Sequence, residues 1–285
     1  VNVQWKVDVP TLNHALVRFA IQITWDFAEG NPICHLAGGY SKCIERIVVG
    51  LESLLCLSGD IKSPTIVRQS SKANLTMADA IVTDPPYYDA IPYSDLMDWF
   101  YVWLRRTIGD FGPDHTVAMK DRLGPKWDPE QSDGELIDDD TRHGGDLCKS
   151  QTAYEDGMTS VFESCSRALT DEGRLVIVFA NKQPDAWATL VGSVIRSGFV
   201  VDGSWPIQTE QPSRTRGISS AALASSVWLV CKKRPITARP GWDNKVLEEM
   251  RANITERLHA YWDAGIRGPD FVWAATGPAM EAYSK

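Results

Sequence analysis

Four consecutive residues have the types and the order needed to bind an amino group. Asp84, Pro85, Pro86 and Tyr87 directly follow residues 80–83, a short apolar segment typical of a buried strand. An exocyclic amino group on a nucleobase is a poor nucleophile because its lone pair is delocalised into the ring. An enzyme that methylates such a group must therefore hold both N–H bonds with acceptors in fixed positions. The Asp84 carboxylate is one acceptor, and the Pro85 carbonyl can be the other.

The two prolines make this turn rigid before any substrate arrives. Each proline fixes its own φ and disfavours the helical conformation in the residue before it. The Pro85 carbonyl is therefore aimed in advance, and such an acceptor needs no reorganisation in the transition state. Tyr87 offers a flat face on which a base taken out of its stack can rest. A purely structural interpretation stays open, in which the prolines end the strand and Tyr87 packs.

Further polar and aromatic residues are expected near this turn. In parallel α/β sheets ligands bind at the carboxyl ends of the strands, and this rule places Asn181 and Trp205 along the edge that holds Asp84. Arg214 and Arg216 lie in a loop between two predicted strands, where guanidinium groups suit the phosphates beside a flipped base. Ordinary packing or surface roles stay open for all of the weaker substrate-binding candidates, which are Tyr88, Asp89, Tyr93, Asn181, Lys182, Trp205, Arg214 and Arg216.

The elements that must position these residues alternate between helix and strand. Apolar periodicity predicts helices over residues 41–57, 94–108, 158–169, 187–195 and 244–260, and strands over residues 65–68, 80–83, 174–180, 199–205 and 226–232. Ser94 is the predicted N-cap of the second helix. This alternation predicts an α/β fold with three layers, in which helices cover both faces of a mostly parallel sheet.

Three regions follow from this order of elements. Residues 1–60 are predicted to form an N-terminal helical segment, residues 61–234 a catalytic core, and residues 235–285 a C-terminal helical tail. Within the core, residues 109–150 are rich in Gly, Pro and Asp and show no periodicity. We interpret them as a long surface loop inserted into the core.

Composition and charge exclude several classes of protein. The 285 residues include 37 acidic and 29 basic side chains, for a formal net charge of −8, and 44% are hydrophobic. This composition excludes a wholly disordered, collagenous or coiled-coil chain. The longest strongly apolar run, residues 175–180, is far shorter than the roughly 20 residues that span a membrane. The negative charge disfavours a general nucleic-acid coat without excluding local basic patches.

The cysteines and the first residues bear on the cellular setting. Six cysteines are dispersed without a Cys-x-x-Cys pair, so we expect no metal site and a reduced, cytoplasmic setting. Residues 1–10 have the pattern of neither a signal peptide nor a transit peptide, so no export is expected. The sequence starts at Val1 rather than at a methionine, which fits a piece of a longer polypeptide.

Around residues 84–87 the sequence resembles the amino-group methyltransferases that use S-adenosylmethionine. It is most similar to the large prokaryotic adenine-specific DNA methylases, some of which carry a zinc ribbon and an N-terminal domain of unknown function. The similarity covers most of the chain from residue 25 onward, in blocks that occur in the same order. These blocks are WDFAEGNP, VTDPPYYDAIPYSDLMDWFYVWLRR, GRLVIVFANKQPDAW, GFVVDGSWPIQTE and WDAGIRGPDFVWAATGPAMEAY.

The resemblance implies a Rossmann-like, S-adenosylmethionine-dependent methyltransferase fold and adenine-specific methylation of DNA. It implies that Asp84 and Pro85 receive the target amino group and that Tyr87 stacks on the flipped base. The family's Gly-x-Gly cofactor loop and its zinc ribbon have no counterpart here, and the nearest candidate loop, residues 271–277, lacks Gly-x-Gly. We therefore interpret the chain as the C-terminal part of a methylase, whose cofactor-binding half precedes Val1 or belongs to a partner subunit.

Two alternatives stay open at this point. The same tetrapeptide occurs in RNA guanine methylases and protein glutamine methylases, so an amino group of RNA or protein is an alternative substrate. The missing cofactor loop and the net charge of −8 favour a non-catalytic half that binds DNA or a partner. Whether this chain is active alone therefore stays open.

Overall fold

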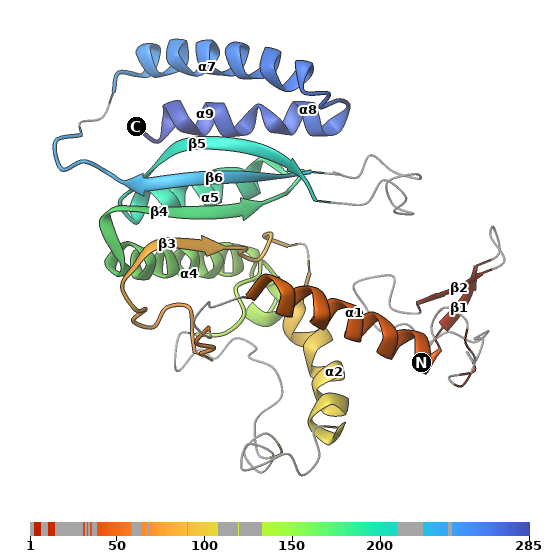
Figure 1. Cartoon of the computed structure of the whole chain (residues 1–285). Coiled ribbons are helices and arrows are strands. Elements are labelled where there is room, and N and C mark those ends of the chain that lie inside the picture. Colours follow the sequence, from red (N-terminus) through yellow and green to blue (C-terminus); the bar gives the residue numbers. More distant parts are fainter. Residues whose placement is uncertain are drawn as a thin grey trace. The chain divides into compact units, whose positions relative to one another are not determined.

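The computed structural model covers residues 1–285 and describes the ranges 3–6, 11–14, 39–58, 64–67, 69–89, 91–107, 133–209, 225–238 and 241–285, with the single residues 31, 33, 35 and 119. The chain divides into two compact units. The first consists of Val1–Arg68 and Asp95–Leu123, and the second of Gln69–Ser94 and Gly124–Lys285. Helices and strands are labelled as in Figure 1.

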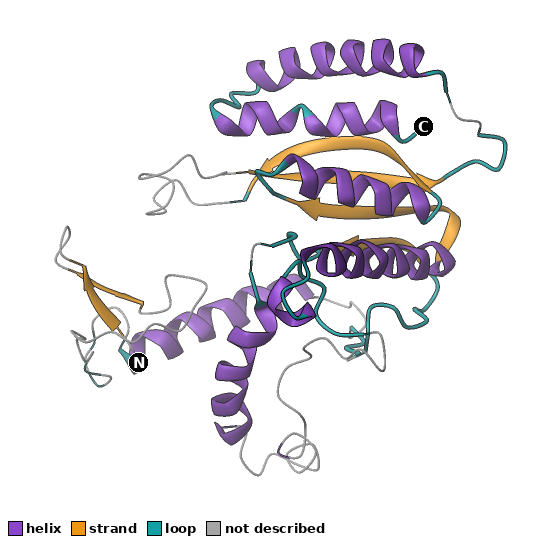
Figure 2. Ribbon diagram, turned by 180° about the vertical axis from the view of Figure 1, so that it is seen from behind, coloured by secondary structure: helices purple, strands orange, loops and turns teal. Residues whose placement is uncertain are grey.

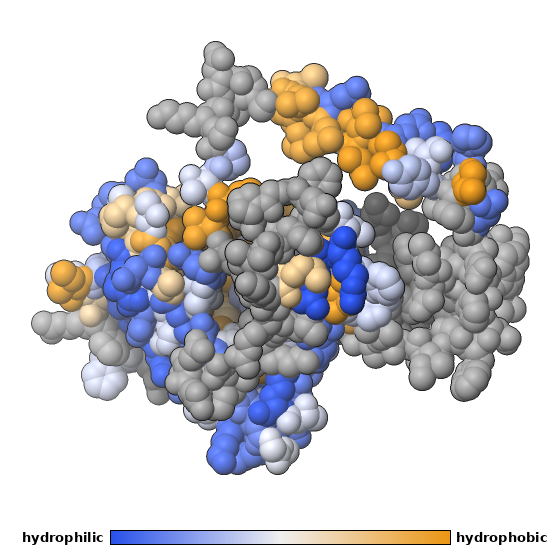
Figure 3. All heavy atoms as spheres, turned by 90° about the horizontal axis from the view of Figure 1, so that it is seen from below, coloured by the Kyte–Doolittle hydropathy of each residue, from blue (hydrophilic) through white to orange (hydrophobic). Residues whose placement is uncertain are grey.

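The first unit combines a small sheet with long helices. Strands β1 (Val3–Lys6) and β2 (Thr11–His14) pair antiparallel, so the N-terminal segment is not only helical as predicted. Helix α1 (Tyr40–Ser58) matches its predicted range to within a residue, and most of α2 (Tyr93–Thr107) also belongs here. Large apolar side chains remain exposed along α1, where Figure 3 shows them gathered. The predicted strand at residues 65–68 is wrong for the described residues 64–67, which form no regular structure.

The second unit is an α/β structure built on four strands. The strands are β3 (Ala78–Thr83), β4 (Leu169–Phe179), β5 (Phe199–Gln208) and β6 (Ser225–Lys233), in the sheet order β3-β4-β6-β5. The helices are η1 (Asp140–His143), α4 (Leu147–Ala168), α5 (Pro184–Arg196), α7 (Asp243–Asp263), α8 (Pro269–Ala274) and α9 (Thr276–Tyr283). The α/β class is thus as predicted.

The sheet is mixed, because one of its four strands runs opposite to the other three. Strands β3 and β4 pair parallel, whereas β6 pairs antiparallel with both β4 and β5, so β3, β4 and β5 run in one direction and β6 runs in the opposite one. A parallel pair needs a crossover connection, which α4 provides between β3 and β4. Strands β5 and β6 follow each other without a described helix between them and pair as neighbours, so the sheet is mixed.

The two faces of this sheet have different environments. The closed face consists of Leu175, Ile177, Phe179, Val227, Leu229 and Cys231, which are buried against α4 and α5. Figures 1 and 2 show α4 and α5 on the same side of the sheet. The opposite face, with Val176, Val178, Trp228 and Val230, is only partly buried, and none of the unit's described helices packs on it. The predicted third layer is therefore wrong for the described part of this unit.

The C-terminal helices cover the β5 edge of the sheet. Helix α7 packs on α9, and α9 packs beside β5. The Val201 N–H donates to Ser284 Oγ over 2.8 Å, and Arg234 Nη2 donates to the Ser284 carbonyl over 2.7 Å. Gly277 of α9 lies so close to Ser204 of β5 that a Cβ atom would collide with the serine side chain. The outer edge of β5 is therefore occupied by the chain itself.

The observed helices α4, α8 and α9 correct two other predictions. Helix α4 begins at Leu147 rather than near residue 158, because the Asp146 side chain accepts a hydrogen bond from the Lys149 N–H and caps it. The predicted surface loop, residues 109–150, therefore ends in η1 and the first turn of α4, and most of its earlier part lies outside the described residues. Residues 271–277 form α8 and the start of α9 rather than a strand, a turn and a helix. No helix in the described ranges has the length and apolar character needed to cross a membrane.

Candidate functional site

The DPPY motif, residues 84–87, lies at the carboxyl end of β3. Asn181 follows the end of β4, and because these two strands are parallel the two segments meet at one edge of the sheet. Asn181 Nδ2 donates a hydrogen bond to the Tyr87 carbonyl over 3.0 Å. The structure thus brings together the two strand ends that the sequence predicted to be neighbours.

Side chains from distant parts of the second unit hold the backbone of this loop. The buried Tyr154 hydroxyl of α4 donates to the Pro86 carbonyl over 2.7 Å and accepts from the Tyr88 N–H over 3.2 Å. Asn181 binds the Tyr87 carbonyl, and its own backbone carbonyl accepts from Trp187 Nε1 over 2.9 Å. The shape of the loop is therefore fixed by α4 and by the end of β4. Asn181 is a buried clamp on the loop rather than a surface contact for the substrate backbone.

Tyr88 is a core residue and not part of a pocket wall. It is 5% exposed, and its ring packs edge to face on Tyr154 with centroids 5.3 Å apart. Burial, followed by a hydrogen bond with Asp138, raises the pKa of Tyr88 to about 12. Its φ is +64°, a left-handed conformation that costs a side-chain-bearing residue roughly 1–3 kcal/mol. The surrounding contacts therefore hold a strained turn directly after the motif.

Two acceptors of the loop remain available. Among the described residues no donor binds the Pro85 carbonyl, whereas the carbonyls of Pro86, Tyr87 and Tyr88 each accept a hydrogen bond. Within the described part of the chain, the one donor to the Asp84 carboxylate is the Tyr87 hydroxyl, which binds Oδ1 over 2.7 Å. The arrangement leaves Asp84 Oδ2 and the Pro85 carbonyl as acceptors on adjacent residues of a rigid turn.

Two tyrosines lie beside these acceptors. The Tyr87 ring packs edge to face on Phe179, with centroids 5.4 Å apart, so it is partly buried. Tyr93, the first residue of α2, is 48% exposed. Burial raises the pKa of Tyr93, and the negative charges of Asp84 and Glu135 raise it further. Tyr93 is therefore an exposed aromatic side chain that senses the charge of Asp84.

A buried ion pair fixes the start of α2 and so the position of Tyr93. Glu135 accepts from the Ser94 N–H over 2.9 Å and from Ser94 Oγ over 2.7 Å. Arg142 Nη1 lies 2.6 Å from the same carboxylate. The prediction that Ser94 is the N-cap is therefore wrong, because Ser94 lies inside the helix and the distant Glu135 carboxylate binds its N–H. Glu135 and Arg142 lie in a stretch without periodicity, so no signal in the sequence marks them as partners of Ser94.

The remaining predicted site residues are less closely tied to the motif. Asp89 is exposed and accepts from Gln183 Nε2 over 2.9 Å, and Lys182 is exposed beside it. Trp205 lies inside β5, which continues to Gln208, so the prediction that it follows a strand is wrong. In the sheet order, β4 and β6 separate β5 from β3. Arg214 and Arg216 lie outside the described residues.

The described residues do not fit a cofactor loop. Residues 271–277 are helical, and Gly277 serves the close packing on Ser204 rather than a ligand. Within the described ranges, no three His, Cys, Asp or Glu side chains gather as a metal site. Among the described residues, the free acceptors at Asp84 and Pro85 are therefore the features with chemical potential, and no glycine-rich loop accompanies them.

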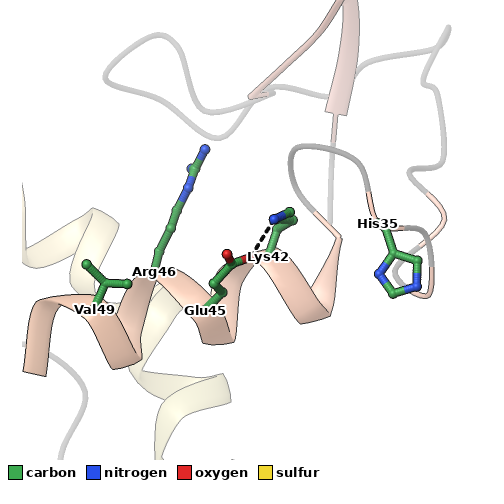
Figure 4. A pocket seen from close by; sticks show the side chains of 5 residues that line it. All are labelled: His35, Lys42, Glu45, Arg46 and Val49. Carbon is green, nitrogen blue, oxygen red and sulfur yellow. Dashed lines mark hydrogen bonds and ion pairs between the residues drawn. The ribbon is translucent and has the colours of Figure 1, made fainter. Parts of the chain in front are cut away.

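A hollow of about 510 Å³ belongs to the first unit. It is lined by His35, Lys42, Glu45, Arg46 and Val49 (Figure 4). Lys42 and Glu45 form an ion pair at 2.5 Å, while the Arg46 side chain points away from them. Because these side chains converge on no common point and none is a predicted site residue, the motif remains the candidate site.

Comparisons with protein-family models, curated proteins and solved structures found no match to this chain. The functional argument therefore depends on the residues and their geometry.

Proposed function

We propose that this chain is the base-binding part of an S-adenosylmethionine-dependent DNA methyltransferase with a Rossmann-like fold. The target is an exocyclic amino group, and N6 of adenine is the amino group that the sequence resemblance favours. The observation that carries the proposal is the Pro85 carbonyl. It accepts no hydrogen bond from the described residues, although the next three carbonyls of the same loop are all bound.

The two acceptors suit the chemistry of an amino group. One N–H bond is directed to Asp84 Oδ2 and the other to the Pro85 carbonyl, which localises the lone pair on nitrogen. The Tyr87 hydroxyl holds Asp84 Oδ1, so the carboxylate does not rotate when the base arrives. Because Tyr154 and Asn181 fix the loop, the acceptors are oriented before binding, and this lowers the cost of reaching the transition state.

The aromatic residues beside the acceptors support a base as the ligand. A base that is methylated on its exocyclic amino group must leave the duplex, and flipped bases stack on aromatic side chains. Tyr93 is half exposed next to the charge of Asp84, and Tyr87 lies in the motif itself. We also infer a cytoplasmic setting, in which free thiols such as Cys43, Cys56 and Cys148 stay reduced.

The proposal is tested by the product that the natural polypeptide, or its complex, makes from DNA. DNA incubated with the protein and S-adenosylmethionine is digested to nucleosides, and N6-methyldeoxyadenosine is measured by mass spectrometry. We expect Asp84→Ala to lower its formation at least about 100-fold, since oriented electrostatic contacts contribute this much. Asp171→Asn is the matched control, because it alters a fully exposed carboxylate near the start of β4, at the opposite end of that strand from Asn181, and should leave the rate unchanged. Full activity of Asp84→Ala would reject the proposal, and a methylated guanine in RNA or a methylated glutamine would redirect it to the alternative substrates.

A non-catalytic half is the second candidate, favoured by the lack of a cofactor loop in the described residues. Such a module would bind DNA or a partner equally well with and without S-adenosylmethionine. Measuring the dissociation constant for DNA in both conditions separates the candidates, since a strong cofactor effect excludes the non-catalytic one.

A further inference from the structure

One segment of the second unit holds both ends of the loop that leads from the motif into α2. At the first end, the Tyr88 carbonyl accepts from the Asp138 N–H over 3.3 Å. At the other end, the Glu135 carboxylate binds the N–H and the hydroxyl of Ser94. We call the segment that supplies both contacts, residues 135–142, the strap.

The strap is itself anchored on α4. Leu136 and Ile137 are buried. Leu136 lies so close to Gly157 of α4 that a Cβ atom on this glycine would collide with the leucine side chain. The Ser150 hydroxyl, also of α4, donates to Asp138 Oδ1 over 2.5 Å. The strap therefore fixes the loop relative to a helix of the core.

The strap is too short to let the loop extend. Glu135 and Asp138 are three residues apart, so their backbones lie within about 10 Å of each other. Residues 88–94 could span about 20 Å if they were extended. The strap thus folds this loop back and holds Tyr93, near its end, within reach of the motif. In agreement with this, burial and then the negative charges of Asp84 and Glu135 raise the pKa of Tyr93.

The ion pair of the strap is a costly way to hold a helix start. The side chains of Glu135 and Arg142 are only 7% and 11% exposed. Arg142 also donates to Ser94 Oγ over 3.2 Å and pairs with Asp139. A local serine or aspartate cap would hold the helix start without burying charges. Because a buried ion pair often stabilises a fold no more than apolar residues would, we explain this pair by the position that it imposes.

The other end of the loop is also held at a cost. Tyr88 is kept at a φ of +64°, and backbone strain that the surroundings maintain is concentrated at functional sites. Between these two fixed ends, Tyr93 keeps an aromatic side chain that is 48% exposed. The loop therefore presents this ring from a rigid support.

We propose that Asp138, Glu135 and Arg142 are positioning residues for the methyl transfer, with separate tasks at the two ends of the strap. This inference rests on the proposed function. Asp138 holds Tyr88 directly after the motif, so it orients the acceptors for the amino group. The Glu135–Arg142 pair holds the first turn of α2, so it keeps Tyr93 where its ring lies against the bound base.

The two tasks predict different kinetic changes in the natural polypeptide or complex. A stacking contact acts on the bound base before and during the reaction, so its loss raises KM and leaves kcat nearly unchanged. Tyr93→Ala should raise the KM for DNA about tenfold, the contribution of one base–aromatic stack, and Tyr93→Phe should keep the original KM. Asp138→Ala should instead lower kcat about 10- to 100-fold, because it releases the loop that carries the acceptors.

A double-mutant cycle tests whether Glu135 acts through Tyr93. Glu135→Ala should raise the KM for DNA about as much as Tyr93→Ala does, and the double variant should be no worse than Tyr93→Ala. Glu135→Gln keeps an acceptor for the Ser94 N–H and should recover most of the loss. If Glu135→Ala does not fold, Arg142→Lys replaces it in the cycle, because lysine cannot make the same set of contacts. Effects that multiply in the double variant would overturn the positioning role.

The matched control is Glu281→Ala. Glu281, in α9, is also buried and also binds a serine hydroxyl, that of Ser204, over 2.8 Å. Both Glu135→Ala and Glu281→Ala should lower the thermal midpoint, but only Glu135→Ala should raise KM when both are assayed well below their midpoints. An equal rise in KM for Glu281→Ala would mean that KM reports lost stability, and the proposal would be rejected.

The same assay separates this proposal from the proposed function. Methylation of DNA with an unchanged KM in Tyr93→Ala and Glu135→Ala overturns the positioning role and leaves the methyltransferase intact. A natural protein that methylates neither DNA, RNA nor protein overturns the proposed function, and this inference with it.

Discussion

The closed face of the sheet and the opposite, open face, which includes Val176, Val178, Trp228 and Val230, are built from similar residues but differ in burial. Ile177 and Val176 are adjacent β-branched residues of β4, and because side chains alternate along a strand they lie on opposite faces. Ile177 is 0% exposed between α4 and α5, whereas Val176 is only partly buried. The comparison teaches that burial, and with it the packing that stabilises this unit, is concentrated on one face of the sheet.

The largest expected loss of stability distinguishes Ile177 from its neighbour Val176. Ile177→Ala should lower the free energy of unfolding by about 2–5 kcal/mol, because it leaves a cavity in a closed core. Val176→Ala should cost less than about 1 kcal/mol, because its surroundings are partly solvent and can relax. Urea unfolding of both variants measures the difference. Equal losses would show that the two faces do not differ in this way.

The next largest loss of stability is expected from the Tyr154 hydroxyl, which holds the motif loop. Tyr154→Phe keeps the ring on the closed side but removes the hydroxyl that binds Pro86 and Tyr88. Losing these two hydrogen bonds should cost about 1–3 kcal/mol in total, although the Tyr88 N–H and the Pro86 carbonyl keep the bond between them. Thermal unfolding measures this loss, with Tyr283→Phe as the control because Tyr283 is exposed. A cost as small as that of the control would mean that α4 does not fix the loop.

A smaller loss of folding stability should appear when the pH is raised. Burial raises the pKa of the closed-face thiol Cys231 to about 12, well above that of an exposed thiol. The folded chain thus keeps this proton while the unfolded chain loses it, so stability is constant below about pH 9 and falls as the pH rises toward 12. At pH 10 the loss is about 1 kcal/mol.

Urea midpoints between pH 8 and 10.5 test this expectation. Cys231→Ala should flatten the decline with pH, even if its stability at pH 8 is lower. Cys148→Ala, at an exposed cysteine, should keep the original slope. A slope that is unchanged in Cys231→Ala would assign the decline to other groups.

The smallest effect is expected at the charged end of the open side. Asp202→Asn weakens its pairs with Arg174 and Lys232, and all three side chains are more than a third exposed. Exposed ion pairs contribute about 0–1 kcal/mol, and salt screens them. The loss should therefore stay below that of Tyr154→Phe and shrink as salt is added to the urea titration. A loss comparable to Ile177→Ala would place stability on the open side as well.

Local patterns in the sequence predicted the elements around the motif. The apolar run before Asp84 and the two prolines after it mark the end of β3, and the periodicity of α1 gave its range to within a residue. The juxtaposition of Asp84 and Asn181 followed from one general rule about parallel strands. These predictions succeeded because they depend on neighbouring residues or on a single pairing.

Contacts between distant residues could not be predicted in the same way. Tyr154 is 68 residues from Pro86 in sequence, and Glu135 is 41 residues from Ser94. No local pattern links such pairs, so the clamp and the true cap of α2 were missed. The strand at residues 174–180 was predicted from a continuous apolar run, but only alternate residues of β4 are buried. Apolar character therefore indicated the strand without showing which face would be covered.

The covered edge of β5 limits how this protein can associate. Ser284 and Arg234 tie the C-terminal helices to that edge, so a neighbour cannot add a strand there. A sheet with two bare edges can extend indefinitely and form fibres, whereas a sheet with one bare edge stops after a single addition. The tie at β5 therefore removes one of the two sheet edges from which such a fibre could grow.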